Sequence, residues 1–239
     1  IKENRTYDQV FGDLPQGNAD PALCVFGREV TPNHHAVAEQ FALLDNYYCN
    51  GVLSADGHAW ATEGYVTDYL EKSFGGFTRS YPFAGDDPLS YSATGFIWDN
   101  LLLHGLSFRN YGEMSTTAVL PKEADWLAIY ENHRTNGNAM AFQHDMQIET
   151  LRRYSCAQSP GWNMRIPDCI RADVFLNEFS EYEKKGEWPN LVIIYLPNDH
   201  TSGTRVGSPT PRAQVADNDL AVGRIIERIS RSRFWPKTC

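Results

Sequence analysis

The fold of this chain is decided by residues 191–200, which read LVIIYLPNDH. A continuous run of apolar and β-branched residues, here 191–196, is typical of a strand buried on both faces of a parallel sheet. In open α/β sheets, ligands bind at the carboxyl ends of the strands. The stretch therefore predicts an α/β fold, and it places a candidate site in the polar segment 197–200.

Helices and strands alternate along the rest of the chain. Apolar spacing and capping residues predict helices over 31–46, 54–72, 94–104, 142–155, 170–185 and 213–231, and strands over 46–49 and 107–111. Glycine, proline and polar residues predict loops over 74–92 and 198–212. The alternation predicts one domain over residues 1–239, with a three-layer α/β/α architecture and a mostly parallel sheet.

The composition narrows the class of protein. Of the 239 residues, 42% are hydrophobic and 21% are charged, which excludes a disordered chain and is enough for a substantial core. The formal net charge of -9 argues against nucleic-acid binding, because phosphate backbones select a basic surface. No stretch approaches the ~18 apolar residues of a membrane-spanning helix, so no transmembrane segment is predicted.

The five cysteines form no CxxC pair, which argues against a zinc knuckle. Cys156 and Cys169 bracket the loop around Ser159-Pro160-Gly161, and we expect them to close it as a disulfide. The odd number leaves one thiol free or paired with a partner outside the chain. Disulfides favour an extracytoplasmic location, either periplasmic or secreted.

Both ends of the sequence lead us to expect a piece of a longer protein. In an alternating α/β domain, Glu3-Asn4 should follow a first strand that the sequence does not contain. The last helix should lead into a further strand, and none follows before Cys239.

Three polar clusters are candidates for one site. Glu3 and Asn4 are adjacent oxygen donors of the kind that hard metal ions prefer, although a polar pair near a terminus is also typical of solvated surface. Asp199 is a candidate metal ligand. His200 is a candidate phosphate-binding imidazole or general acid, although Pro197-Asn198-Asp199 also has the chemistry of a simple turn.

Ser54 is the candidate nucleophile. At a helix N-terminus its hydroxyl would lie among backbone N–H groups that favour a phosphate. The alternative is an ordinary N-cap serine. His58, one turn further on, is a candidate ligand, phosphate contact or packing residue. Of His34 and His35, which point to different faces of a helix, we expect at most one to be functional.

Several of these segments resemble a known family. Residues 3–12, ENRTYDQVFG, resemble the ENRTFDxxFG opening of a bacterial phosphoesterase family that includes phospholipase C-type enzymes and acid phosphatases, within the alkaline phosphatase superfamily. Further similar stretches are TPNHH at 31–35, LDNY at 44–47, SADGH at 54–58, PNDHT at 197–201 and VADND at 215–219. The resemblance spans nearly the whole chain.

The resemblance implies an alkaline phosphatase-like fold and a metal-dependent phosphoester hydrolase. Glu3, Asn4 and Ser54 would be ligands of a divalent metal ion (zinc, calcium, manganese or magnesium), with Asp199 as a further ligand. Ser54 would be phosphorylated during turnover, and His58 and His200 would contact phosphate. The substrate would be a phosphorylated small molecule or a phospholipid head group. Candidate aromatic contacts for it are Phe74, Phe77, Tyr81 and Phe83.

The sequence departs from the superfamily pattern at its end. The superfamily has paired aspartates after a further strand, and then a histidine, but the sequence stops at Cys239. Half of the implied metal site is therefore absent from this sequence. The alternative hypothesis is a non-catalytic extracellular structural or binding protein that retains the fold. A sulfatase is less well supported, because no C/S-x-P-x-R motif occurs around Ser54.

Overall fold

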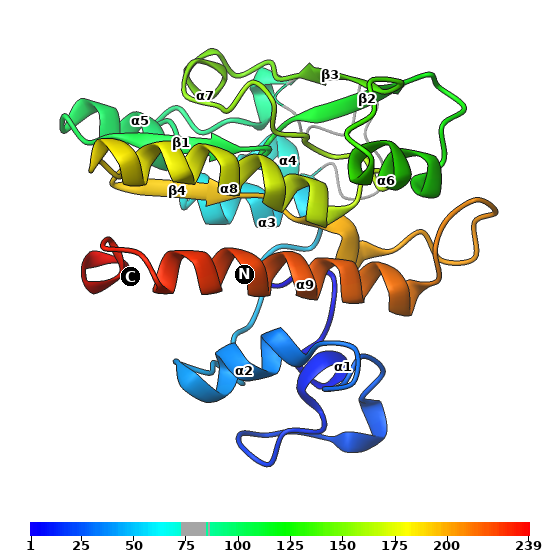
Figure 1. Cartoon of the computed structure of the whole chain (residues 1–239). Helices are drawn as coiled ribbons and strands as arrows, with labels where there is room; N and C mark the ends of the chain where they lie inside the picture. Colours follow the sequence, from blue (N-terminus) through cyan, green and yellow to red (C-terminus); the bar gives the residue numbers. More distant parts are fainter. Residues whose placement is uncertain (73–84, 86) are drawn as a thin grey trace.

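The computed structural model describes residues 1–72, 85 and 87–239, and shows a mixed α/β fold (Figure 1). Its central feature is a pair of parallel strands, β1 (Phe108–Tyr111) and β4 (Leu191–Ile194), in which Phe108 pairs with Leu191 and Tyr111 with Ile194. The predicted strands at 107–111 and 191–196 are thus confirmed, and so is the presence of parallel strands in an α/β fold.

A second, antiparallel pair lies beside the first. It consists of β2 (Thr116–Leu120) and β3 (Ala141–Asp145). The described helices are α1 (Tyr7–Phe11), α2 (Pro32–Gln40), α3 (Ser54–Glu63), α4 (Asp68–Lys72), α5 (Ile97–Leu103), α6 (Trp126–Arg134), α7 (Glu149–Arg153), α8 (Asp168–Lys185) and α9 (Pro211–Ser230). Short 3-10 turns are η1 (Pro21–Leu23), η3 (Pro88–Ser90), η4 (Pro197–His200) and η5 (Trp235–Lys237).

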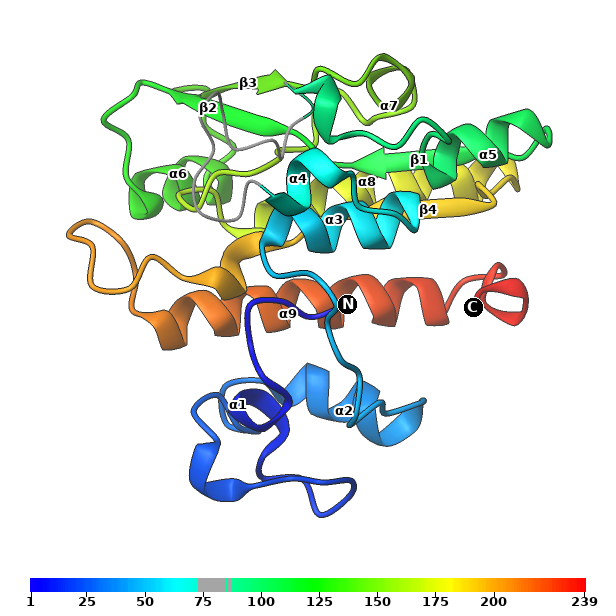
Figure 2. The same cartoon turned by 180° about the vertical axis from the view of Figure 1, so that it is seen from behind.

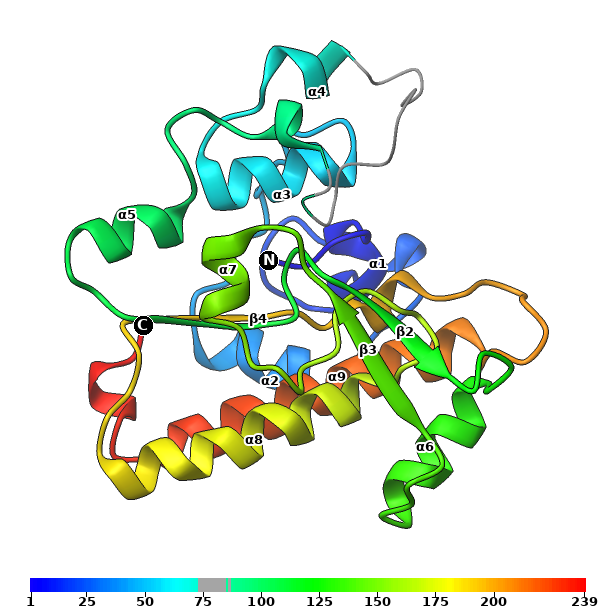
Figure 3. The ribbon, with the colours of Figure 1, turned by 90° about the horizontal axis from the view of Figure 1, so that it is seen from above.

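Helices cover both sides of the parallel strands. Seen from behind, α3 and α4 lie on one side of β4 and α8 lies on the other (Figure 2). From above, α8 and α9 run side by side (Figure 3), and α1 and α2 lie on the side of α9 away from the strands (Figure 1). None of the described helices is both long and apolar enough to cross a bilayer.

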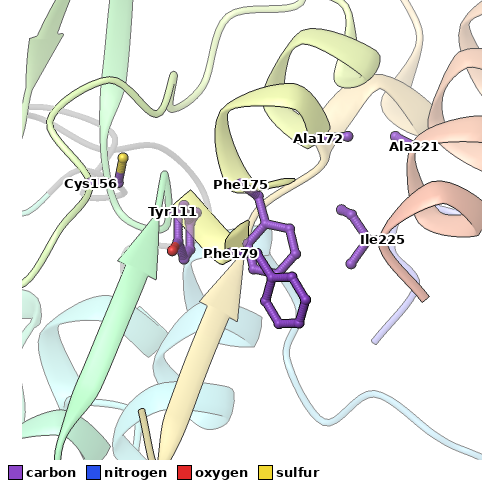
Figure 4. Packing of buried hydrophobic residues seen from close by; sticks show 7 residues of the cluster. All are labelled: Tyr111, Cys156, Ala172, Phe175, Phe179, Ala221 and Ile225. Atoms are coloured by element: carbon purple, nitrogen blue, oxygen red, sulfur yellow. The ribbon is translucent and has the colours of Figure 1, made fainter. Parts of the chain in front are cut away.

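The core between β1, α8 and α9 follows from helical spacing. Ala172, Phe175 and Phe179 recur at three- and four-residue intervals on α8, and each is 0% exposed. They pack against Tyr111 of β1 and Ile225 of α9 (Figure 4). The rings of Tyr111 and Phe175 meet edge to face, with centroids 5.1 Å apart. This packing confirms the helices predicted over 170–185 and 213–231.

Other predicted elements are wrong or have different bounds. Residues 142–155 form β3 and then α7 instead of one helix, because Phe142 pairs across the antiparallel ladder with Val119 and packs in its cluster. The sequence analysis missed β2. Residues 46–49 form no strand, since they pair with no other segment in the described chain. The helix over 54–72 breaks at Gly64, whose φ of 65° ends α3.

The remaining differences are smaller. The helix predicted over 31–46 ends at Gln40, and the one over 94–104 is α5. All four residues of β4 are partly exposed, so this strand is less buried than predicted. Most of the predicted loop 74–92, including the four aromatic candidates, lies outside the described residues.

The expected Cys156–Cys169 disulfide is not formed. All five cysteines fall within the described residues and are free thiols. Cys156 packs in the core cluster with Tyr111 and Phe175, whereas the Cys169 thiol donates to the carbonyl of Asp217. The two sulfurs therefore lie in different surroundings.

From this core we expect the free energy of unfolding to fall far more when a buried apolar side chain is truncated than when an exposed one is. Phe175→Ala removes a fully buried ring shared by two helices and a strand, and should lower the free energy of unfolding by about 3–5 kcal/mol. Leu103→Ala, at a side chain that is 82% exposed, should change it by less than about 0.5 kcal/mol. Urea denaturation of both variants measures the difference, and equal effects would contradict the core described above.

Candidate functional site

The polar clusters meet at the carboxyl edge of the parallel strands. Glu113 follows β1, and Asp199 and His200 follow β4 within η4. Parallel strands end at the same edge of a sheet, so these segments are brought together. The N-terminus of α3 supplies Ser54, and the chain before α1 supplies Glu3.

The centre of the site is a chain of three side chains from distant parts of the sequence. The Ser54 hydroxyl donates to Oε1 of Glu3 over 2.7 Å. The other carboxylate oxygen of Glu3, Oε2, lies 2.9 Å from Nε2 of His200. The His200 ring packs edge to face against Trp162, with centroids 5.1 Å apart. Glu3, Ser54 and His200 are therefore brought together, as the sequence analysis predicted for one site.

Ser54 does not act as the helix cap. The N-cap position of α3 is Leu53, and the backbone N–H groups of Val52 and Leu53 donate to Oδ2 of Asp56. Asp56 thus binds the backbone just before the helix, as in the second half of a capping box, and the Ser54 hydroxyl donates to Glu3. The alternative that Ser54 is an ordinary cap is wrong.

His200 lies between two carboxylates. Its Nδ1 is 3.3 Å from Oδ1 of Asp199, and its Nε2 faces Glu3. Carboxylates only accept hydrogen bonds, so both ring nitrogens carry protons. Burial by itself would lower the pKa of His200, but the bonds to Asp199 and Glu3 outweigh it and raise the pKa to about 9. The hydrogen bond from His200 also holds the pKa of Glu3 below its usual range.

A second imidazole belongs to the same site. Nδ1 of His58 lies 2.6 Å from Oε1 of Glu113. Burial opposes a charge on His58, but Glu113 outweighs it and raises the pKa of the histidine. The charge of His58 also acts on Glu3 and His200, so the three groups are electrostatic neighbours.

Lys2 extends the network on the side of Asp199. Its Nζ lies 3.2 Å from Oδ2 of Asp199 and 3.2 Å from Nε2 of His34. An ammonium only donates, so Nε2 of His34 accepts, and Nδ1 carries the proton that is donated to Asp219 over 2.6 Å. Burial lowers the pKa of His34, which agrees with this neutral form.

His35 has a structural role. It is 0% exposed and bonds through Nε2 to Asp13 and through Nδ1 to Thr31. Of the two adjacent histidines, only His34 therefore joins the polar network.

The exposed side chain of Asn4, also predicted as a ligand, takes no part in this network of described residues. Its neighbour Arg5 instead donates to the backbone carbonyls of Asp199, over 2.7 Å, and His200, over 3.2 Å. The sequence analysis missed Lys2, Arg5 and Glu113. Glu113 has a detectable signal, since it is an acidic residue just after the strand predicted over 107–111.

The fit to a metal ion is partial. Glu3 and Ser54 place two oxygens side by side, but Asp199 faces His200 and Lys2. Among residues 1–72, 85 and 87–239, no three His, Cys, Asp or Glu side chains are arranged to hold a metal ion. The described residues thus supply part of a ligand set.

A shallow pocket of about 220 Å³ lies away from this site, on α8 and α9. Its lining includes Arg224, Arg228 and Arg231, each of which is paired with a carboxylate (Asp173, Glu183 and Glu227, respectively). The positive charges of this pocket are therefore already neutralised.

Comparison with models of known protein families, with curated proteins and with solved structures found no match to this chain.

The position of His200 between two carboxylates predicts a pH-dependent stability. Its pKa rises from 6.5 to about 9 on folding, so its stabilising effect is complete below about pH 6.5 and is lost as the pH rises through about 9. In buffer with a chelator, wild type should exceed His200→Gln in free energy of unfolding by about 1–2 kcal/mol at pH 6, and by less at pH 10. A pH-independent difference would contradict the geometry.

Proposed function

We propose that this chain is a phosphoester hydrolase that uses Ser54 as its nucleophile, within a three-layer fold of the alkaline phosphatase type. The observation that carries the proposal is the hydrogen bond from Ser54 to Glu3, two residues 51 positions apart in the sequence. Glu3 also holds His200, so a hydroxyl, a carboxylate and an imidazolium converge at the edge where α/β folds bind ligands.

Each group has a role that its surroundings support. The ionised carboxylate of Glu3 orients the Ser54 hydroxyl and accepts its proton as Oγ bonds to phosphorus. The imidazolium groups of His200 and His58 face the negative charge that develops on the phosphoryl oxygens. Once Glu3 holds the serine proton, it no longer holds the Nε2–H of His200 as an anion, and that proton passes to the leaving alcohol. Water then attacks phosphorus and gives a proton to His200, the Oγ–P bond breaks, and Ser54 takes its proton back from Glu3.

A divalent metal ion belongs to the proposal through the family resemblance. Glu3 and Ser54 are the residues of this chain that would hold it, with the exposed Asn4 next to them. A catalytic metal generally needs three protein ligands, and the described residues bring together only two oxygens. The roles above are therefore assigned to the protein's own groups and not to the metal.

The proposed substrate is a phosphorylated small molecule or a phospholipid head group. The net charge of -9 argues against a nucleic acid. An extracytoplasmic location is also part of the proposal, although the Cys156–Cys169 disulfide that was expected to support it is not formed. Cys49 and Cys239 are exposed, which suits a disulfide or assembly partner outside the chain.

Removing the nucleophile tests the proposal directly. Ser54→Ala should reduce turnover of p-nitrophenyl phosphate and bis(p-nitrophenyl) phosphate by several orders of magnitude, because no other group replaces the attacking oxygen. Ser230→Ala, a control on α9 whose hydroxyl donates to the backbone carbonyl of Glu227, should keep full activity. The assay is run with zinc, calcium, manganese and magnesium in turn.

The outcomes separate the hypotheses. Activity of Ser54→Ala within tenfold of wild type would exclude Ser54 as the nucleophile. No turnover by wild type with any of the four metals would favour the non-catalytic extracellular protein. A serine-linked phosphoryl group, detected by mass spectrometry of wild type quenched in acid, would support the covalent intermediate.

Glu3 is tested through metal affinity. Glu3→Gln removes a charged oxygen donor and should weaken binding of zinc to the chelator-stripped protein by about tenfold or more, measured by isothermal titration calorimetry. Glu123→Gln, at an exposed carboxylate, is the matched control. Unchanged affinity of Glu3→Gln would remove Glu3 from the ligands.

A further inference from the structure

The turn after β1 passes close to the backbone of Pro160. Gly112 has a φ of 92°, and a Cβ at this position would lie 2.6 Å from the carbonyl oxygen of Pro160. Met114, two residues on, also has a positive φ, 48°. This sharp turn between β1 and β2 restricts the backbone conformation at Glu113.

Asn110 fixes the backbone of Glu113 from both sides. Its side-chain oxygen accepts from the Glu113 N–H over 3.1 Å, and its amide nitrogen donates to the Glu113 carbonyl over 3.1 Å. The same nitrogen donates to Oγ of Ser155 over 2.8 Å, which anchors Asn110 itself. Asn110 is 0% exposed, so this arrangement is held within the core.

The Glu113 side chain is directed to His58. Glu113 is 6% exposed, and a carboxylate buried to this degree is costly unless it is paired. Its Oε1 lies 2.6 Å from Nδ1 of His58 on α3. The His58 ring is also packed edge to face by Tyr195, with centroids 6.0 Å apart. Its orientation is thus set by residues that follow both parallel strands.

We propose that Glu113 is a positioning residue of the candidate site: it accepts the Nδ1–H of a doubly protonated His58, so that the Nε2–H of the ring donates to a bound phosphoryl group. This inference rests on the proposed function for the identity of the ligand. Because a carboxylate only accepts, its partner nitrogen must carry the proton. Carboxylates behind functional histidines commonly fix the orientation of the ring in this way.

The arrangement repeats around the site. His200 is backed by Asp199, which follows β4, and His58 is backed by Glu113, which follows β1. The two parallel strands are therefore each followed by a carboxylate that holds one imidazole, and both imidazoles interact electrostatically with Glu3.

Imidazole nitrogen spectra of the 15N-labelled protein test the inference without any activity. In wild type, His58, assigned with His58→Gln, should show a protonated, hydrogen-bonded Nδ1. Glu113→Leu removes the acceptor and should abolish this signature. Glu113→Gln retains an acceptor oxygen and should preserve it, and Glu149→Leu, at an exposed carboxylate on α7, should have no effect. A wild-type His58 with an unprotonated Nδ1 would overturn the inference even if Glu113→Leu did not fold.

Kinetics then test the role of the oriented ring. Glu113→Leu should lower kcat/KM for p-nitrophenyl phosphate by about 10- to 100-fold, with substantial rescue in Glu113→Gln. Adding Glu113→Leu to His58→Ala should cause no further loss, because Glu113 acts through His58. Independent, multiplying effects would overturn the inference. Failure of the proposed function appears separately, as unchanged activity in Ser54→Ala.

Discussion

The rest of the structure depends on one buried ion pair, Asp168 with Arg171, on α8. Both are almost fully buried, at 0% and 1% exposure, and Nη1 of Arg171 donates to Oδ1 of Asp168 over 3.1 Å. Arg171 also donates to the carbonyls of Pro160, Gly161, Asn163 and Ile166, so the loop before α8 is wrapped around the guanidinium. Burial raises the pKa of Asp168 to about 7, although Arg171 opposes the shift. Loss of either partner would leave a buried group without compensation.

The same carboxylate organises the site. Oδ2 of Asp168 accepts from the backbone N–H of Asn198 in η4 and from the side chain of Asn218 on α9. Asp168 thereby anchors the η4 turn, which carries Asp199 and His200. Arg5, from the N-terminal segment, donates to the backbone carbonyls of the same two residues. Asp168, which lies outside the site, thus fixes the position of the polar side chains that follow β4. The packing of α8 against α9, centred on Phe175 and Phe179, keeps the two helices in the position that this network requires.

Prediction from the sequence succeeded where a segment carries its own periodic signal. The apolar run at 191–196 and the amphipathic patterns of 170–185 and 213–231 correspond to β4, α8 and α9. It failed where pairing with a distant segment decides the outcome. Residues 141–145 have no strong strand pattern and become β3 only because β2 lies alongside, and residues 46–49 have strand-like composition but no partner. The prediction of a Cys156–Cys169 disulfide was wrong for a similar reason. Spacing along the chain does not show that the two thiols lie in separate surroundings.

The sequence by itself determined that the fold is mixed α/β with parallel strands, and it supplied the residue types of the candidate site: Glu3, Ser54, His58, Asp199 and His200 are all recognisable from local patterns. Only the tertiary structure decided how they are connected. It directs Ser54 to Glu3, gives His34 and His35 different partners, and adds Glu113 and Lys2 as partners of His58 and Asp199. The physical reason is that hydrogen bonds and ion pairs form between neighbours in space. For this site those neighbours lie up to 197 positions apart along the chain, as with Glu3 and His200.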